Sequence, residues 1–136
     1  MAIDQDIYLA ADNIVTTRDG YMLLIRRRNP PFQGMWAFPG GFIETDEELV
    51  DAAVMELAEE TGLKVPVHEM ELVATEGSVG RDPRFRTVSV VYHAVLEERR
   101  SVKEADDAAD AKWFPIVDLP EMAFDHRTIL EKLNLI

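Results

Sequence analysis

The chain has 136 residues, enough for one compact domain with its own core, and its 47% hydrophobic and 29% charged residues are ordinary for a soluble globular protein. It contains no cysteine, which excludes a disulfide framework and a thiolate metal site. With 26 acidic and 14 basic residues, the net charge of -12 disfavours binding to nucleic acid. No apolar run is long enough to cross a membrane and no signal peptide is recognisable, so we expect a cytoplasmic protein.

The first part of the chain predicts a pair of strands and a short third strand. Residues Ile7–Thr16 are rich in β-branched and apolar side chains, and Asp19–Gly20 is typical of a turn. Tyr21–Arg27 then predicts a returning strand. A proline pair interrupts it, and Trp36–Phe38 predicts a short strand that ends at a proline and two glycines.

The clearest helix follows the glycine pair. Its apolar stripe recurs at spacings of three and four residues: Val50, Ala53, Val54 and Leu57. We expect Thr45 or Asp46 to cap this helix. Glu47 and Glu48 would lie in its first turn, where negative charge favours the helix dipole. Gly62 is expected just past its last residue.

The second part of the chain predicts further strands and a closing helix. Glu71–Thr75 and Thr87–Leu96 have the composition of strands, whereas Glu97–Asp110 is acidic and irregular. Lys112–Phe114 predicts one more short strand, and Phe124–Leu135 a final helix. No linker or repeat divides the chain. We therefore expect a single α/β domain over residues 1–136, with a mixed β-sheet between helices.

Three glutamates of the central helix carry the chemistry. Glu56, Glu59 and Glu60 are spaced i, i+3 and i+4, which places them on one face of the helix. Like charges at that spacing repel by roughly 0.2–0.5 kcal/mol per pair. A hard divalent cation would reverse the sign, because Mg²⁺ prefers carboxylate oxygens. The alternative is a solvated acidic face on an acidic protein.

The glycine pair just before this helix supplies the context for those glutamates. Gly41, five residues, Glu47, seven residues and then Met55–Leu63 resemble the signature of the Nudix family, G-x5-E-x7-R-E-U-x-E-E-x-G-U, where U is a bulky aliphatic residue. Every specified position matches except Met55, where the family has arginine. The segment Trp36–Gly41 and the order of the strands are also similar to the family.

This resemblance implies a Nudix-type α/β/α sandwich and a pyrophosphohydrolase. In the family, the glutamates that match Glu56, Glu59 and Glu60 bind divalent cations, Mg²⁺ or Mn²⁺, and a carbonyl of the glycine pair, here Gly40, assists. Hydrolysis of a pyrophosphate requires that its charge be neutralised and that a water be held in line, and clustered carboxylates loaded with metal supply both. We count Glu47 among the catalytic candidates.

The resemblance leaves the general base open. Some family members use a glutamate of the signature, and others use an acid from a later loop. Candidates for the second arrangement are Glu97, Glu98, Glu104, Asp106 and Asp107. A plain solvated loop is the alternative for all five.

Met55 is the one departure from the signature. The family arginine is thought to pair with the acid at Glu47, so this acid needs another partner here. Some Nudix-fold proteins with altered signatures are binding or regulatory modules. We hypothesise that the protein is still an active enzyme.

Segments outside the signature are similar to the ADP-ribose pyrophosphatase-like branch: Arg27–Gly34, Arg81–Arg84, Trp113–Pro115 and Ala123–His126. The implied reaction is the cleavage of ADP-ribose to AMP and ribose 5-phosphate. A ligand of this kind needs arginines for its phosphates and an apolar wall for its base. Candidates to bind the substrate are Arg27, Arg28, Phe32, Arg81 and Arg84. The alternative is that the arginines are surface charges.

Other functions remain open at this point. The substrate could instead be an oxidised nucleoside triphosphate or a nucleotide sugar, or the chain could be a non-catalytic nucleotide sensor. Related pyrophosphatases often pair through their sheets, so a homodimer is one expectation. His126 is expected to form a hydrogen bond at a helix start rather than to act in catalysis.

Overall fold

A parallel pair of long strands forms the centre of the sheet. In the computed structural model, which describes residues 3–102 and 108–136, β1 (Ile7–Thr17) and β6 (Arg86–Leu96) pair over their full length of 11 residues. Both segments consist largely of β-branched and apolar residues, which favour a strand that is buried on both faces. The predicted strands at these two places are confirmed.

The other strand pairs are antiparallel, so the sheet is mixed, as predicted. β2 (Tyr21–Arg27) pairs with β1, with β3 (Trp36–Ala37) and with β7 (Ala108–Pro115). β4 (Gly40–Phe42) pairs with the first half of β1, and β5 (Glu71–Glu76) pairs with β6. Five strands of the seven-stranded sheet follow the order β3-β2-β1-β6-β5, and the other two lie off this path, with β4 paired to β1 and β7 paired to β2.

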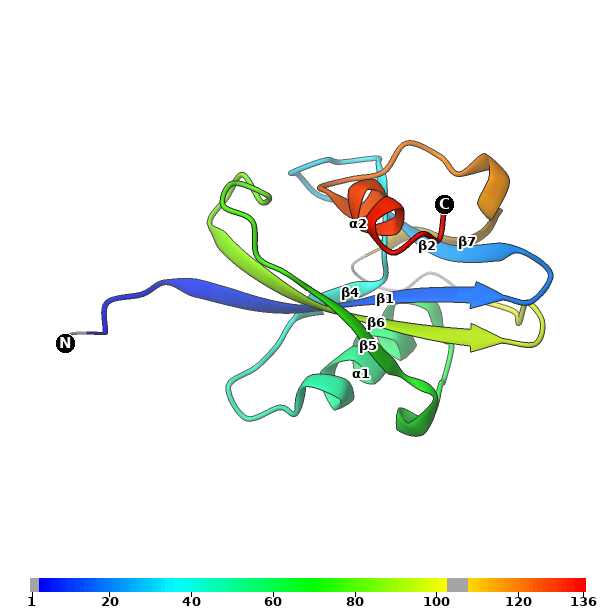
Figure 1. Ribbon diagram of the computed structural model, residues 1–136, viewed down its shortest axis with the longest axis horizontal. Helices are drawn as coiled ribbons and strands as arrows, with labels where there is room; N and C mark the ends of the chain where they lie inside the picture. The colour runs from blue at the N-terminus through cyan, green and yellow to red at the C-terminus, as the bar shows by residue number, and fades with distance from the viewer. Residues whose placement is uncertain (1–2, 103–107) are drawn as a thin grey trace.

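Helices cover both faces of this sheet (Figure 1). The helical segments are α1 (Leu49–Thr61), the 3-10 turns Val67–Glu69 and Ile116–Asp118, and α2 (His126–Lys132). Consecutive residues of β1 point to opposite faces: Ile14 packs with Ile129 of α2, and Val15 packs with Leu57 of α1. The fold is therefore an α/β/α sandwich. Among residues 3–102 and 108–136, no helix is long and apolar enough to span a membrane.

The central helix begins later than the sequence predicts. Its N-cap is Glu48, with an extended backbone and no side-chain cap, so Thr45 and Asp46 do not cap it and Glu47 and Glu48 are not in its first turn. The cause is local, because the Glu44 amide donates to the Glu47 carboxylate at 2.7 Å and closes a turn ahead of the helix. The predicted end is correct, since Gly62 adopts the left-handed conformation (φ 77°) that terminates α1.

Three further boundaries differ from prediction. Strand β4 was not predicted, because a pair of glycines has no intrinsic preference for a strand and pairs here only because β1 lies beside it. Strand β7 extends to Ala108, into the segment expected to be irregular, because β2 offers a partner along its length. Helix α2 is shorter than Phe124–Leu135, since Phe124 (φ 53°) and Asn134 (φ 57°) are left-handed.

His126 joins α2 to the segment that leads into β4. Its ring stacks on that of Phe38, with centroids 4.3 Å apart and planes 6° apart, and its Nδ1 accepts the Phe38 amide hydrogen at 3.1 Å. The residue is only 4% exposed. Burial lowers the pKa of His126, against the opposing attraction of Asp12 and Asp125. The expected role of His126 as a hydrogen bonder at a helix start is confirmed.

We predict that this histidine makes stability fall in mild acid. Above pH 6.5, the ordinary histidine value, the ring is neutral in both states; below it, the unfolded chain takes up a proton that the folded ring resists. The free energy of unfolding from urea titrations should therefore decrease from pH 7.5 to pH 5.5. His126→Asn should flatten that slope. His93, whose pKa burial also lowers, supplies the residual dependence, and an unchanged slope in the variant would refute the assignment.

Candidate active site

The glycine pair of β4 lies between the sheet and α1. The Gly40 amide donates to Glu60 Oε1 at 2.8 Å, and Glu60 is only 3% exposed. A Cβ atom placed on Gly41 would lie 2.6 Å from the carboxyl carbon of Glu56. Two of the three predicted glutamates thus reach consecutive residues of one tight backbone segment. Glycine at position 41 leaves room for the Glu56 carboxylate, which a side chain there would displace.

The third glutamate, Glu59, is exposed at the next turn of the same helix. Within the described parts of the chain, no three acidic or histidine side chains are gathered closely enough to hold a metal ion. The donors nevertheless suit a hard cation, since the carboxylates of Glu56 and Glu60 both lie beside the glycine pair. Mg²⁺ is often held by one or two carboxylates, with waters and substrate phosphates completing its shell. The arrangement fits an ion that is completed by its substrate.

Glu47 and Met55 occupy the two positions of the signature where the family has an acid and the arginine that pairs with it. The Glu47 carboxylate accepts the Glu44 amide hydrogen at 2.7 Å, so it is bound to the turn ahead of α1. Met55 lies on α1 and is 40% exposed. The backbone amide of Glu44 therefore supplies part of what the family arginine would give Glu47.

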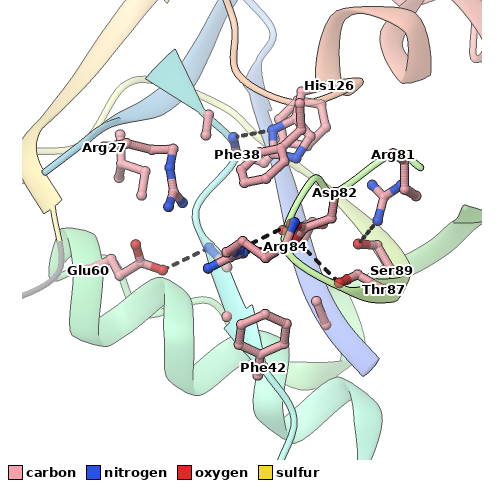
Figure 2. A pocket seen from close by; sticks show the side chains of 17 residues that line it. Arg27, Phe38, Phe42, Glu60, Arg81, Asp82, Arg84, Thr87, Ser89 and His126 are labelled. Carbon is pink, nitrogen blue, oxygen red and sulfur yellow. Dashed lines mark hydrogen bonds and ion pairs between the residues drawn. The ribbon is translucent and has the colours of Figure 1, made fainter. Parts of the chain in front are cut away.

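A pocket opens beside the glycine pair (Figure 2). It contains about 700 Å³ of empty space, a figure that includes open solvent at its mouth. Five of the residues predicted from the sequence line it: Arg27, Gly40, Glu60, Arg81 and Arg84. The structure therefore brings one carboxylate of the signature and three of the four predicted arginines to a single cavity.

Arg84 lines this pocket, and the buried Asp82 holds its guanidinium by hydrogen bonds. Its Nε and Nη2 donate to the Asp82 carboxylate at 3.1 and 2.9 Å. Burial acts to raise the pKa of Asp82, but the hydrogen bonds from Arg84 and Thr87 outweigh it and hold that pKa below its ordinary value. The Arg84 guanidinium also lies 4.9 Å from the ring centroid of Phe85 and 5.5 Å from that of Phe42.

Arg27 contributes a second cation to the same cavity. Its guanidinium lies 4.9 Å from the ring centroid of Phe124, and its Nε donates to the Pro31 carbonyl at 2.7 Å. Burial, and next the positive charge of Arg84, lower the pKa of Arg27. The positive charges of Arg27 and Arg84 repel each other in this partly buried cavity. A bound anion would therefore stabilise the charged form of both side chains.

The other predicted substrate residues are placed differently. The Arg81 side chain, 5% exposed, donates to both oxygens of Asp125 at 2.8 and 2.9 Å and to Ser89 at 2.8 Å. Its guanidinium is thus committed to holding the loop after β5 against the start of α2. Arg28 is exposed and does not line the pocket. Phe32 does not line the pocket, but its ring centroid lies 4.8 Å from that of Phe124, which does.

The later acids do not join the described cavity. Glu97 pairs with Arg18 at 2.7 Å, at the end of β6 opposite to Ser89, which lines the pocket. Eight residues of strand separate the two, roughly 26 Å. Glu98 is exposed. The candidates Glu104, Asp106 and Asp107 lie outside the described residues.

Several residues of the pocket were not predicted from the sequence. Asp12 of β1 lines it, as do Phe42, Phe124 and the hydroxyl residues Thr87 and Ser89. Asp12 had a signal, because an acid in the middle of an apolar strand calls for an explanation. Phe124 lies in the segment Ala123–His126 that resembles the family, but its place in the pocket depends on a left-handed backbone that follows from no local pattern.

Comparison with known proteins identifies the family of this chain. Residues 7–133 match the model of the NUDIX domain family. The chain is 40% identical over 124 residues to an ADP-ribose pyrophosphatase of Methanocaldococcus jannaschii, covering 90% of this chain and 70% of that protein. It is 34% identical to the ADPR responsive transcriptional repressor NtrR of Acinetobacter baylyi, covering 82% of this chain but 45% of the repressor.

A solved structure shows the same fold. The NUDIX domain of Shewanella oneidensis NrtR, crystallised with ADP ribose, superposes with a TM-score of 0.87 at 31% identity, covering 97% of this chain and 89% of that one. The family match spans nearly the whole described sheet and both helices, and the signature lies on the loop and helix where the family has it. The chain therefore belongs to the Nudix family of pyrophosphohydrolases.

Proposed function

We propose that this protein hydrolyses the pyrophosphate bond of a nucleoside diphosphate linked to another group, with Mg²⁺ or Mn²⁺ as cofactor. ADP-ribose is the proposed substrate, and AMP and ribose 5-phosphate are the proposed products. The observation that carries this proposal is that Arg27 and Arg84 share one cavity with Glu60 of the signature helix. Anion-binding and cation-binding groups thus meet where a metal-bound pyrophosphate would need both.

In this proposal the arginines of the pocket bind the phosphates and the glutamates of α1 bind the cation. Arg27 and Arg84 bind the phosphates, and Asp82 holds the Arg84 guanidinium in a fixed orientation. Glu56, Glu59, Glu60 and the Gly40 carbonyl would hold the cation. When bound, such a cation neutralises phosphate charge and activates a water molecule for attack. Aromatic and apolar walls of the cavity, among them Phe42 and Phe124, are suited to a nucleoside.

The relatives support the ligand more directly than the reaction. A pyrophosphatase and a repressor that responds to ADPR both resemble this chain, and the structure that it superposes on contains ADP ribose. The second candidate function is therefore a non-catalytic ADP-ribose sensor, which Met55 also favours. Turnover separates the two.

The first test measures turnover of ADP-ribose and removal of the signature carboxylates. We expect the protein to release AMP from ADP-ribose with Mg²⁺ or Mn²⁺, faster than from nucleotide sugars or oxidised nucleoside triphosphates. Glu60→Gln and Glu59→Gln should each lower kcat roughly 10²–10³-fold, the scale on which one charge-stabilising group contributes. Product release is followed by chromatography.

Asp51→Asn is the matched control, because it removes one exposed negative charge from the same helix. It should keep turnover within about two-fold of wild type if only local charge at the site matters. Binding of ADP-ribose without release of AMP would replace the enzyme by the sensor. Preferred turnover of another nucleotide would replace only the substrate.

The glycine pair offers a sharper test of the metal site. In Gly41→Ala the new methyl group displaces the end of the flexible Glu56 side chain, so turnover and Mn²⁺ affinity should fall about 10- to 100-fold while the free energy of unfolding changes little. In Gly40→Ala the methyl group would lie 2.3 Å from the backbone oxygen of Ala11, so that variant should be destabilised. Equal loss of stability in both would contradict this division.

Restoring the family arginine tests the altered signature. Met55→Arg places a cation on the exposed side of α1 and should raise turnover, with a change in stability below about 0.5 kcal/mol because both residues favour a helix. Steady-state kinetics on both proteins is the measurement. No hydrolysis of any nucleotide by either protein would remove the enzymatic proposal.

A further inference from the structure

Asp12 is a buried carboxylate that the signature does not explain. It lies in the middle of β1, is 8% exposed and lines the pocket. Its side chain forms no hydrogen bond or ion pair with the residues that the structure describes. Its oxygens are not among the fully buried polar atoms and are open to the pocket, so donors supplied by a ligand can reach this carboxylate.

Asp12 and Glu56 lie on opposite faces of the sheet. A Cβ atom on Gly40 would lie 2.5 Å from Asp12 Oδ1, whereas one on Gly41 would meet Glu56. Consecutive residues of a strand point to opposite faces, so Asp12 is on the α2 face and Glu56 on the α1 face. Asn13, the next residue, confirms the alternation by donating to the Ala53 carbonyl of α1 at 3.0 Å. Asp12 therefore reaches the pocket from the α2 face, whereas Glu56 lies on the α1 face.

His126 adds a hydrogen-bond donor beside this acceptor. Its Nδ1 accepts the Phe38 amide hydrogen, so the neutral ring carries its proton on Nε2. The Nε2 atom has no hydrogen-bond partner among the described residues, and His126 lines the same pocket. Asp12 and His126 line the same pocket, and the negative charge of Asp12 acts to raise the pKa of His126 against the effect of burial. An acceptor and a donor together match a hydroxyl group, which both donates and accepts.

We propose that Asp12 accepts hydrogen bonds from the vicinal hydroxyls of a ribose of the substrate, while His126 Nε2–H donates to one of them. An ionised carboxylate has two acceptor oxygens, which suit a diol, and a carboxylate that binds ribose hydroxyls is also how dinucleotide-binding folds read this sugar. Its negative charge repels phosphate, so the ligand is oriented with its phosphates toward Arg27 and Arg84. This inference rests on the proposed nucleotide substrate.

The test is a cycle of binding measurements by calorimetry without divalent ions, so that no turnover occurs. ADP-ribose is compared with its 2′-deoxy analogue on the adenosine ribose and with the corresponding deoxy analogue on the terminal ribose. Wild type should bind one analogue roughly 10- to 100-fold more weakly than ADP-ribose, as expected for a hydrogen bond to a charged group. Asp12→Asn should reduce that discrimination to about two-fold. The analogue that responds identifies which ribose Asp12 contacts.

Two further variants keep the test decisive. Asp12→Ser should behave like Asp12→Asn and serves if the asparagine variant does not fold, and Asp6→Asn, exposed just before β1, should discriminate as wild type does. Equal binding of all three ligands by wild type would overturn the proposal, as would loss of Mn²⁺ binding in Asp12→Asn with discrimination retained. If wild type discriminates against a deoxy analogue but does not hydrolyse ADP-ribose, this inference stands and the proposed hydrolysis is refuted. If it hydrolyses ADP-ribose but binds all three ligands equally, the hydrolysis stands and this inference is refuted.

Discussion

The site depends on the close approach of a side-chain-free backbone to charged groups on both faces of the sheet. Gly40 and Gly41 run in β4 against β1, with Asp12 over one glycine and Glu56 against the other. A methyl group on either residue would overlap with one of these neighbours. The glycine pair thus does more than form a turn, because it lets a carboxylate on each face of the sheet come within contact of the same strand.

Charge is distributed in a way that the net value conceals. The protein is strongly acidic, yet its pocket contains the guanidinium groups of Arg27 and Arg84. Buried acids orient the arginines nearby, since Asp82 binds Arg84 and Asp125 binds Arg81. A cation near Glu56 and Glu60 would complete this pattern, so that a pyrophosphate meets positive charge on two sides inside a negative molecule.

The same pocket suits both an enzyme and a sensor, which agrees with the relatives of this chain. In the proposed function, binding of ADP-ribose would use the arginines, the apolar walls and the donors and acceptors of the α2 face. Hydrolysis would require in addition that the glutamates of α1 hold a cation. The two functions would thus depend on partly different residues, so one could change while the other is kept.

The sequence by itself determined the signature, the central helix and the main strands. The spacing of Glu56, Glu59 and Glu60 and the composition of β1, β2 and β6 are local properties, which survive without knowledge of neighbours. Arg27 and Arg84 were found in the same way, through segments similar to the family. The resemblance to the Nudix family also implied the α/β/α sandwich.

Only the tertiary structure decided how those parts meet. Strands β4 and β7 exist because β1 and β2 offer them partners, and α1 starts late because the Glu47 carboxylate closes a turn. Arg81 was a candidate for the substrate, but Asp125 and Ser89 surround its guanidinium. Asp12 became a candidate ligand residue only when its burial, its face of the sheet and its lack of a described partner were known. These are properties of distant contacts, which no local pattern of residues encodes.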